Sequence, residues 1–337
     1  MLRMHFTAED IARVRVAAAP DPLWEITNSF QTMVANERHP AFGDWQRLSR
    51  SRLPAASRLL AGLLPPRGYS PDFLTPDPTG CSGLESAVDT VLSTSRTVLR
   101  DDMSRLALSP GRLQPLPAEA RALAEAEPAA LRRLGSALLA YHSHALAPYW
   151  PHIRAEVDAD LTLRTRAVLE GGTDGLLASL RPVLRWRPPV LEAEYPVDRE
   201  LHLDGRGLLL QPSFFCGRKP VTLANPELPP ILVYPIQHSH GWLGRQLVGR
   251  RADELGALLG RTRAAILEDV ATGRTTGELA ERFGVSGAAA SYHTAVLRRA
   301  GLLTSRRRGK TVLHTITPVG LAVLEGPPGP PDPLPDV

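Results

Sequence analysis

The spacing of apolar residues predicts a mostly helical region over residues 7–180. Apolar side chains recur at every third or fourth position along several stretches, which places them on one face of an α-helix. Proline-rich segments separate these stretches, and Gly171-Gly172 ends the last long one. The stretches are 23–64, 84–108, 118–146 with a break at Pro128, and 151–170, followed by a short helix over 173–180.

The N-terminus carries two shorter signals. Residues 1–6 alternate between apolar and polar side chains, which is the period of a strand. Thr7 and Asp10 have the spacing of a weak capping box at the start of a helix. They predict a helix over 8–18, which Pro20 ends.

At Arg181 the pattern changes to short apolar runs bounded by proline, glycine and aspartate. Such runs are typical of strands, so we expect a β-rich segment over 186–236. The Asp-Gly-Arg-Gly sequence at 204–207 predicts a turn that joins two of these strands as a hairpin. The runs lie at 190–195, 200–203, 208–215 and 231–236.

Residues 249–317 hold the most specific pattern in the chain. An amphipathic helix is expected over 262–271, and Thr275 and Glu278 then have the spacing of a capping box. The short helix that begins there ends at Gly284, a residue suited to the left-handed turn between two helices.

A second helix is expected over 286–300, and two alternating runs around Gly309-Lys310 predict a β-hairpin over 303–316. This order of elements is that of a winged helix-turn-helix. In that arrangement the recognition helix enters the major groove of DNA, and the hairpin, or wing, reaches phosphates or the minor groove.

The predicted fold class is therefore α+β, with three parts. Residues 1–248 form a regulatory or dimerisation region, and residues 249–317 form the winged helix-turn-helix. Residues 326–337 contain six prolines in twelve positions, so we expect a disordered tail.

The charge distribution supports this division. The chain has 337 residues and 39 basic side chains, 37 of them arginines, but its net charge is only +4. Residues 249–317 carry twelve basic and six acidic residues, whereas residues 1–248 have a net charge of +1. A basic surface on a helix-turn-helix is the electrostatic signature of DNA binding.

Two features exclude other classes of protein. Cys81 and Cys216 lie 135 positions apart, which excludes a disulfide scaffold and a zinc site of the Cys-x-x-Cys type. No apolar run approaches the roughly 20 residues of a membrane helix, and the start of the chain lacks the apolar stretch of a signal peptide. We expect a cytoplasmic protein that does not associate with a membrane.

The candidate DNA contacts fall into three groups. Short residues and Tyr292 in the first half of the recognition helix would face base edges, and arginines at its end and in the wing would face the DNA backbone or the minor groove. Threonines at a helix N-terminus would bind a phosphate. The candidates are Thr275, Thr276, Ser286, Gly287, Ala288, Ser291, Tyr292, His293, Arg298, Arg299, Arg306, Arg307, Arg308 and Lys310.

Other motifs do not predict chemistry. Gly309-Lys310-Thr311 lacks the earlier glycine of a phosphate-binding loop, because position 304 is threonine. The histidine pairs 142/144 and 238/240 are more typical of core or surface residues than of metal ligands. We expect no catalytic residue, no metal site and no cofactor.

In the stretch TTGELAERFGVSGAAASYHTAVLRRAGLLTSRRRGKTVLHTITPVG the sequence resembles the ArsR-type winged-helix repressors of bacteria. The start of the chain and the Trp150–Arg154 segment are similar to a group of actinobacterial regulators with this domain at the C-terminus. The resemblance implies a homodimeric, sequence-specific repressor whose DNA affinity responds to a signal. The short helix over 278–283 lacks the cysteine pair of metal-sensing members, so thiolate metal sensing is not implied.

The predicted function is transcription regulation, with double-stranded DNA and a second copy of the chain as partners. The N-terminal region would sense a small-molecule effector or mediate dimerisation. An alternative is an enzyme or a small-molecule-binding protein with a fused winged helix, although no nucleophile, base and orienting group come together in the sequence. A further alternative is an interaction protein whose N-terminal region only dimerises.

Overall fold

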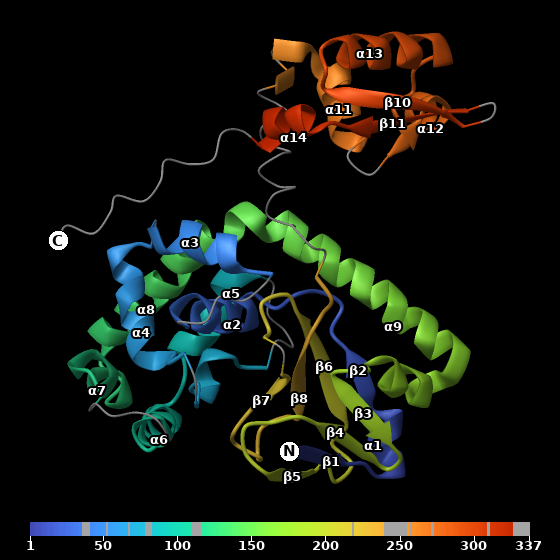
Figure 1. Ribbon diagram of the computed structural model, residues 1–337. Helices are drawn as coiled ribbons and strands as arrows, with labels where there is room; N and C mark the ends of the chain where they lie inside the picture. Colours follow the sequence, from blue (N-terminus) through green and yellow to red (C-terminus); the bar gives the residue numbers. More distant parts are fainter. Residues whose placement is uncertain are drawn as a thin grey trace, which may run out of the picture. The chain divides into compact units, whose positions relative to one another are not determined.

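The computed structural model divides the chain into two compact units, which lie within residues 1–239 and residues 240–337 (Figure 1). The described residues are 1–35, 41–51, 53–66, 68–77, 83–109, 116–217, 219–238, 255–256, 258–270, 273–308 and 311–325, without the side chains of Arg308 and Glu325. The predicted disordered tail and Cys81 lie outside the described residues. No helix among the described residues is long and apolar enough to cross a membrane.

The first unit contains a four-stranded sheet in the order β3-β4-β1-β5. The strands are β3 (Leu184–Arg187), β4 (Val190–Ala193), β1 (Leu2–His5) and β5 (Arg199–His202). Burial alternates along β1, as the sequence pattern predicts, and Leu2 pairs with Ala193 of β4 and Arg199 of β5. The expected strand at the N-terminus is confirmed.

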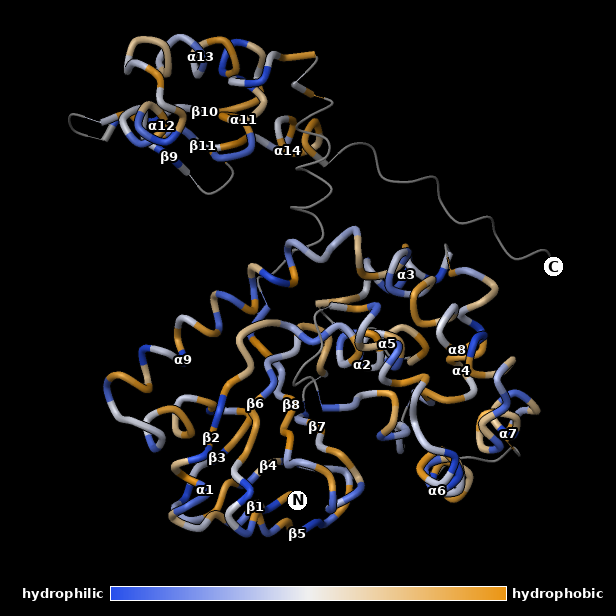
Figure 2. The backbone as a smooth tube through the Cα atoms, turned by 180° about the vertical axis from the view of Figure 1, so that it is seen from behind, coloured by the Kyte–Doolittle hydropathy of each residue, from blue (hydrophilic) through white to orange (hydrophobic). Residues whose placement is uncertain are grey.

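A second sheet has the order β2-β6-β8-β7, in which β2, β6 and β8 are parallel. It consists of β2 (Val14–Val16), β6 (Leu208–Ser213), β8 (Ile231–Pro235) and β7 (Val221–Thr222). Figure 2 shows the hydrophobic character of β6 and β8, and both strands are almost completely buried. Parallel strands covered on both faces are typically rich in apolar residues, and β8 is apolar throughout, whereas β6 also buries Gln211 and Ser213.

The predicted helix over 8–18 is wrong beyond residue 12. Helix α1 (Ala8–Ala12) begins at the predicted capping box, but the chain then extends into β2. Val14 and Val16 are β-branched, and β2 pairs with the buried strand β6. Pairing over a long sequence distance outweighs the weak local preference for helix.

The predicted hairpin at 204–207 is also wrong, because β5 and β6 belong to different sheets. Gly207 has a φ of 73° and donates its N–H to the buried carboxylate of Asp10 at 2.8 Å. A Cβ atom on Gly207 would lie 2.5 Å from the Cβ of Arg13, so only glycine fits this crossing. The turn directs the chain from one sheet to the other.

The helices of the first unit lie within the predicted stretches, but residues 93–95 divide the stretch 84–108 into two helices. The helix break at Pro128 is confirmed, and non-helical dihedral angles at Gly171 and Gly172 interrupt the long helix where the sequence predicts its end. The helices are α2 (Pro22–Val34), α3 (Gly43–Ser51), α4 (Arg58–Leu63), α5 (Leu84–Leu92), α6 (Arg96–Ala107), α7 (Ala118–Ala124), α8 (Pro128–Tyr141) and α9 (Trp150–Ser179). Short 3₁₀ helices are η1 (Ala55–Ser57), η2 (Asp72–Leu74) and η4 (Ala147–Tyr149), and η3 (His142–Leu146) is π-helical.

Buried carboxylates of the helices accept hydrogen bonds from the second sheet and from the residues that follow its strand β6. Glu25 of α2 is fully buried and accepts the backbone N–H groups of Phe214 and Phe215 at 2.7 and 2.9 Å. Burial raises the pKa of Glu25 to about 7, although the two backbone donors favour its ionised form. Asp160 of α9 accepts the hydroxyl of Tyr234 at 2.7 Å in the same way.

The described part of the second unit has a core to which its helices and the two strands of its hairpin contribute. Its elements are α11 (Arg261–Asp269), β9 (Arg274–Thr275), α12 (Thr276–Arg282), α13 (Gly287–Arg299), β10 (Leu303–Arg308), β11 (Thr311–Ile316) and α14 (Pro318–Glu325). The buried core consists of Ile266, Leu267, Val270, Leu279, Ala290, Leu297, Leu302, Leu303 and Leu324.

Helix α14 corrects the predicted end of this unit. The sequence predicts that the domain stops at residue 317. An eight-residue helix does follow, and its Leu324 is only 2% exposed within the shared core. The described domain therefore extends beyond residue 317.

Candidate DNA-binding site

The corner between α12 and α13 is built from the residues that the sequence indicates. Thr275 and Glu278 form the capping box, with the Glu278 N–H donating to Thr275 Oγ1 at 3.3 Å and the Thr275 N–H donating to Glu278 Oε2 at 2.7 Å. Gly284 has a φ of 60°, and Ser286 Oγ caps α13 by accepting the Ala289 N–H at 3.1 Å. Left-handed backbone favours glycine, so this corner depends on Gly284.

One face of α13 is held in the core, and this decides which face is exposed. Ala290, Thr294 and Leu297 are buried, and Thr294 Oγ1 donates to the carbonyl oxygen of Ala290 at 2.9 Å. At 3.6 residues per turn, the opposite face carries a different stripe. This outer face consists of Ala288, Ser291, Tyr292, Ala295 and Arg299.

Most of the expected base-reading residues lie on the outer face. Ala288 and Ser291 are exposed, and the side chain of Tyr292 is 63% exposed. His293 is only partly exposed, and its Nδ1 is shielded from solvent without a hydrogen-bond partner. His293 therefore lies toward the side of α13, while Ala295, absent from the sequence-based candidates, lies on the outer face.

The wing is a regular antiparallel hairpin of β10 and β11. Leu303 pairs with Ile316, and Arg306 and Arg307 pair with Leu313 and Val312. Because consecutive strand residues point to opposite faces, the exposed side chains of Arg306 and Arg307 diverge. The predicted contacts at the side chain of Arg308 and at Lys310 lie outside the described residues.

A buried histidine joins the wing to the helix pair. His314 of β11 is 4% exposed; its Nδ1 is hydrogen-bonded to Ser305 Oγ at 2.8 Å and its Nε2 to Thr276 Oγ1 at 2.9 Å. Burial, and to a lesser extent the Arg298 cation, lowers the pKa of His314, so the ring is neutral at pH 7. The sequence does not indicate this role of His314, because its two hydrogen-bond partners come close to it only when the strands pair.

Internal hydrogen bonds occupy the two threonine hydroxyls that the sequence assigns to a phosphate. Thr275 Oγ1 donates to Glu278 Oε2 at 3.0 Å, and Thr276 Oγ1 is bonded to His314. These contacts stabilise the start of α12 and do not leave the hydroxyls aimed at a ligand. We therefore assign both threonines a positioning role.

Not every basic residue of this unit is available to an anion. The carboxylate of Asp269 is 12% exposed and accepts from Arg274 Nε and Arg282 Nε, both at 3.1 Å. Within the described residues, Arg298, Arg299 and Arg306 form no ion pair. Among the described residues, arginines without an ion pair therefore lie at the end of α13 and on the wing, and also on α11, at Arg261 and Arg263.

Comparison with known proteins agrees with this geometry. The family whose model matches is described as a helix-turn-helix domain, and the match covers residues 258–306. The C-terminal unit contains a helix-turn-helix domain. No curated protein and no solved structure matched the chain. The helix-turn-helix domain supports DNA binding and a coarse role in transcription regulation.

We predict that His314→Ala destabilises the helix-turn-helix domain by about 1–3 kcal/mol, because it leaves the partly buried hydroxyls of Thr276 and Ser305 without their shared partner. The lowered pKa means that the stabilisation by neutral His314 is complete above the ordinary histidine pKa of about 6.5 and is lost as the pH falls below it. Urea unfolding between pH 5 and pH 8 measures both effects. If the free energy of unfolding depends on pH in the same way in the wild type and the variant, this role of His314 is contradicted.

Proposed function

We propose that this protein is a transcription regulator, and more specifically a repressor, that binds operator DNA as a homodimer. The outer face of α13 would enter the major groove, and the wing would contact the backbone or the minor groove. The single observation that supports the proposal most is the exposed stripe of α13 beside arginines that form no ion pair with a described residue. The regulator has no catalytic role in this proposal.

The outer face favours close approach to the base pairs. Ala288, Ser291 and Ala295 are short, so the backbone of α13 can lie deep in the groove, where small apolar groups contact thymine methyls. Tyr292 is the largest side chain on this face and would provide much of the direct base contact. Long charged side chains occur only at its end, at Arg299.

The exposed face of α9 supports the homodimer. Ile153 and Val157 are buried on the inner side of this helix, while the opposite side is exposed from Ala155 to Leu169. The side chain of Leu169 is 82% exposed, and Leu163 and Val168 are 58% and 41% exposed. At 3.6 residues per turn, Leu169 lies on the side opposite Ile153 and Val157, whereas Leu163 and Val168 lie on the two flanks of the helix. A highly exposed leucine on this side would be covered in a helix–helix interface.

The same face of α9 is complementary to itself. If two copies of α9 pack antiparallel about a two-fold axis at Thr162, Asp158 of each copy faces Arg166 of the other. In the same arrangement Leu169 of one copy faces the small residue Ala155 of the other, which leaves room for the large leucine side chain. A two-fold interface requires this kind of self-complementarity.

We predict that the double substitution Arg306→Ala/Arg307→Ala weakens binding to random-sequence DNA and lowers the salt slope of log K by about 2, because roughly one counterion is released for each phosphate contact. Fluorescence anisotropy over a range of salt concentrations measures the slope. The matched control is Arg132→Ala/Arg133→Ala, which removes two exposed consecutive arginines from α8. An equal slope in the wing variant and the wild type would contradict the assignment.

We predict that Asp158→Arg weakens the dimer by at least roughly tenfold, because it places like charges opposite each other twice in a two-fold interface. The swap Asp158→Arg/Arg166→Asp should restore dimerisation, since it reverses both charges of each pair. Sedimentation equilibrium measures the dissociation constant. A dimer insensitive to Asp158→Arg, or a monomeric wild type, would overturn the role of α9.

A further inference from the structure

A pocket of about 490 Å³ lies in the first unit where β2 ends and α2 begins. Residues 17–22 form one wall, and Gln211 of β6 holds this wall in place because its Nε2 donates to the carbonyl oxygen of Ala19 at 3.0 Å. Strands β2, β6 and β8 are parallel, so their carboxyl ends lie at the same edge of the sheet. Ligands of open parallel sheets bind in the crevice outside this edge.

The other wall is built by an irregular segment between α8 and α9. His142 and Trp150 are eight residues apart, and a continuous α-helix would separate them by about 12 Å along its axis. The π-helical η3 and the following 3₁₀ turn η4 change the direction of the chain. The rings of His142 and Trp150 therefore meet at a centroid distance of 5.2 Å and line the same pocket. Segments with π-helical geometry are frequent at functional sites.

Three polar side chains in this pocket have unused binding capacity. Among the described residues, Arg154 forms no ion pair and the ring of His142 makes no hydrogen bond. Asp21 uses Oδ1 to accept the N–H groups of Leu23 and Trp24, both at 2.9 Å, and its Oδ2 makes no hydrogen bond to a described residue. Burial lowers the pKa of His142, so at pH 7 its ring is neutral and offers both a donor and an acceptor.

The chemistry of the lining limits the class of ligand. The volume falls within the usual range for small-molecule sites. A ligand with several phosphates is disfavoured, because it would find only one arginine and would lie beside the Asp21 carboxylate. The N-terminus of α2 does not offer a phosphate site either, because Asp21 already caps it. The indole of Trp150 provides an aromatic surface, and Leu84 and Ala87 add apolar contacts.

We propose that this pocket binds a small aromatic carboxylate with a polar ring substituent. The ligand's ring would lie against Trp150, its carboxylate would pair with Arg154, and its hydroxyl or amino group would bind His142 or Asp21. An ion pair between arginine and a carboxylate supplies orientation as well as affinity. The role of this ligand as an effector rests on the regulatory function proposed above. Binding of the ligand to the pocket does not require DNA.

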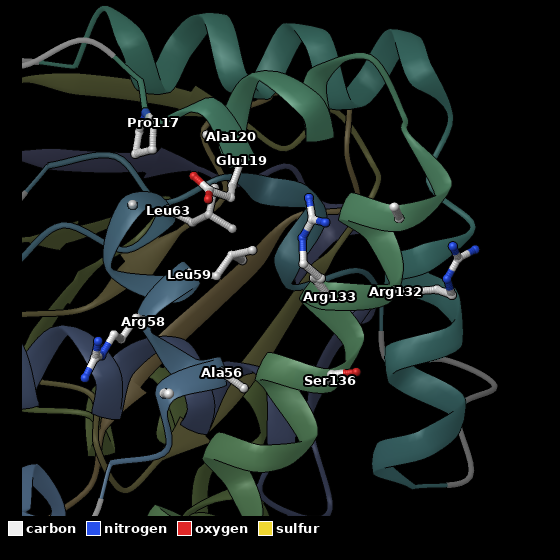
Figure 3. A pocket seen from close by; sticks show the side chains of 13 residues that line it. Ala56, Arg58, Leu59, Leu63, Pro117, Glu119, Ala120, Arg132, Arg133 and Ser136 are labelled. Atoms are coloured by element: carbon white, nitrogen blue, oxygen red, sulfur yellow. The ribbon is translucent and has the colours of Figure 1, made fainter.

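A larger hollow of about 710 Å³ between α4, α7 and α8 lacks this convergence of polar groups. In Figure 3 Arg133 lies beside Leu59 and Leu63, whereas Arg58 and Arg132 extend away from the hollow. Its charged groups therefore do not define one ligand orientation. Arg132 provides a matched control for Arg154, because both are exposed arginines without an ion pair in the described structure.

Isothermal titration of the full-length protein with 4-hydroxybenzoate and 4-aminobenzoate, in the absence of DNA, tests the proposal. We expect one site per chain, with affinity at least roughly tenfold weaker in Arg154→Gln and unchanged in Arg132→Gln. Cyclohexanecarboxylate, which lacks the aromatic ring, should bind more weakly than either probe. Absence of binding by both probes at millimolar concentration, or equal binding by Arg154→Gln and the wild type, would overturn the proposal. The result is independent of whether the protein binds DNA.

Discussion

The burial of one stripe of α13 is the constraint on which the candidate DNA-binding surface depends. Ala290, Thr294 and Leu297 occupy a core shared with the other elements of the domain, so α13 cannot rotate without exposing them. This fixes Tyr292 and the short residues around it on the outside. The buried ring of His314 adds a second constraint, because it joins β10, β11 and the start of α12. The wing and the outer face of α13 are thus held in one geometry.

A different kind of interaction, the hydrogen bond to a buried carboxylate, holds the first unit together. Carboxylates buried at α1, α2 and α9 accept hydrogen bonds from the second sheet and from the turn that leads into it, so segments far apart in the sequence are held together. A buried acceptor that loses its partner costs more than the bond itself contributes, which makes such contacts specific. The same contacts fix the wall of the pocket beside α2, because Glu25 and Asp21 both lie at the start of that helix.

Local signals explain which parts of the structure can be predicted from the sequence. The capping boxes at Thr7 and Thr275, the corner at Gly284 and the alternating wing strands all depend on neighbours within a few residues. The family match over residues 258–306 agrees with that interpretation. The charge distribution also points to this domain, but it counts Arg274 and Arg282, which both pair with the single carboxylate of Asp269.

The features that sequence analysis missed depend on distant contacts. Strand β2 forms because β6, almost 200 residues later, pairs with it, and the turn at 204–207 connects two sheets that no local pattern distinguishes. Likewise, the role of His314 appears only when β11 brings it to Ser305 and Thr276. The central claim is that the outer face of α13 reads DNA sequence, and selection of bound fragments from a random DNA library tests it most directly. The account predicts that the wild type enriches a defined motif and that Tyr292→Ala enriches an altered one; recovery of the same motif by both proteins would contradict it.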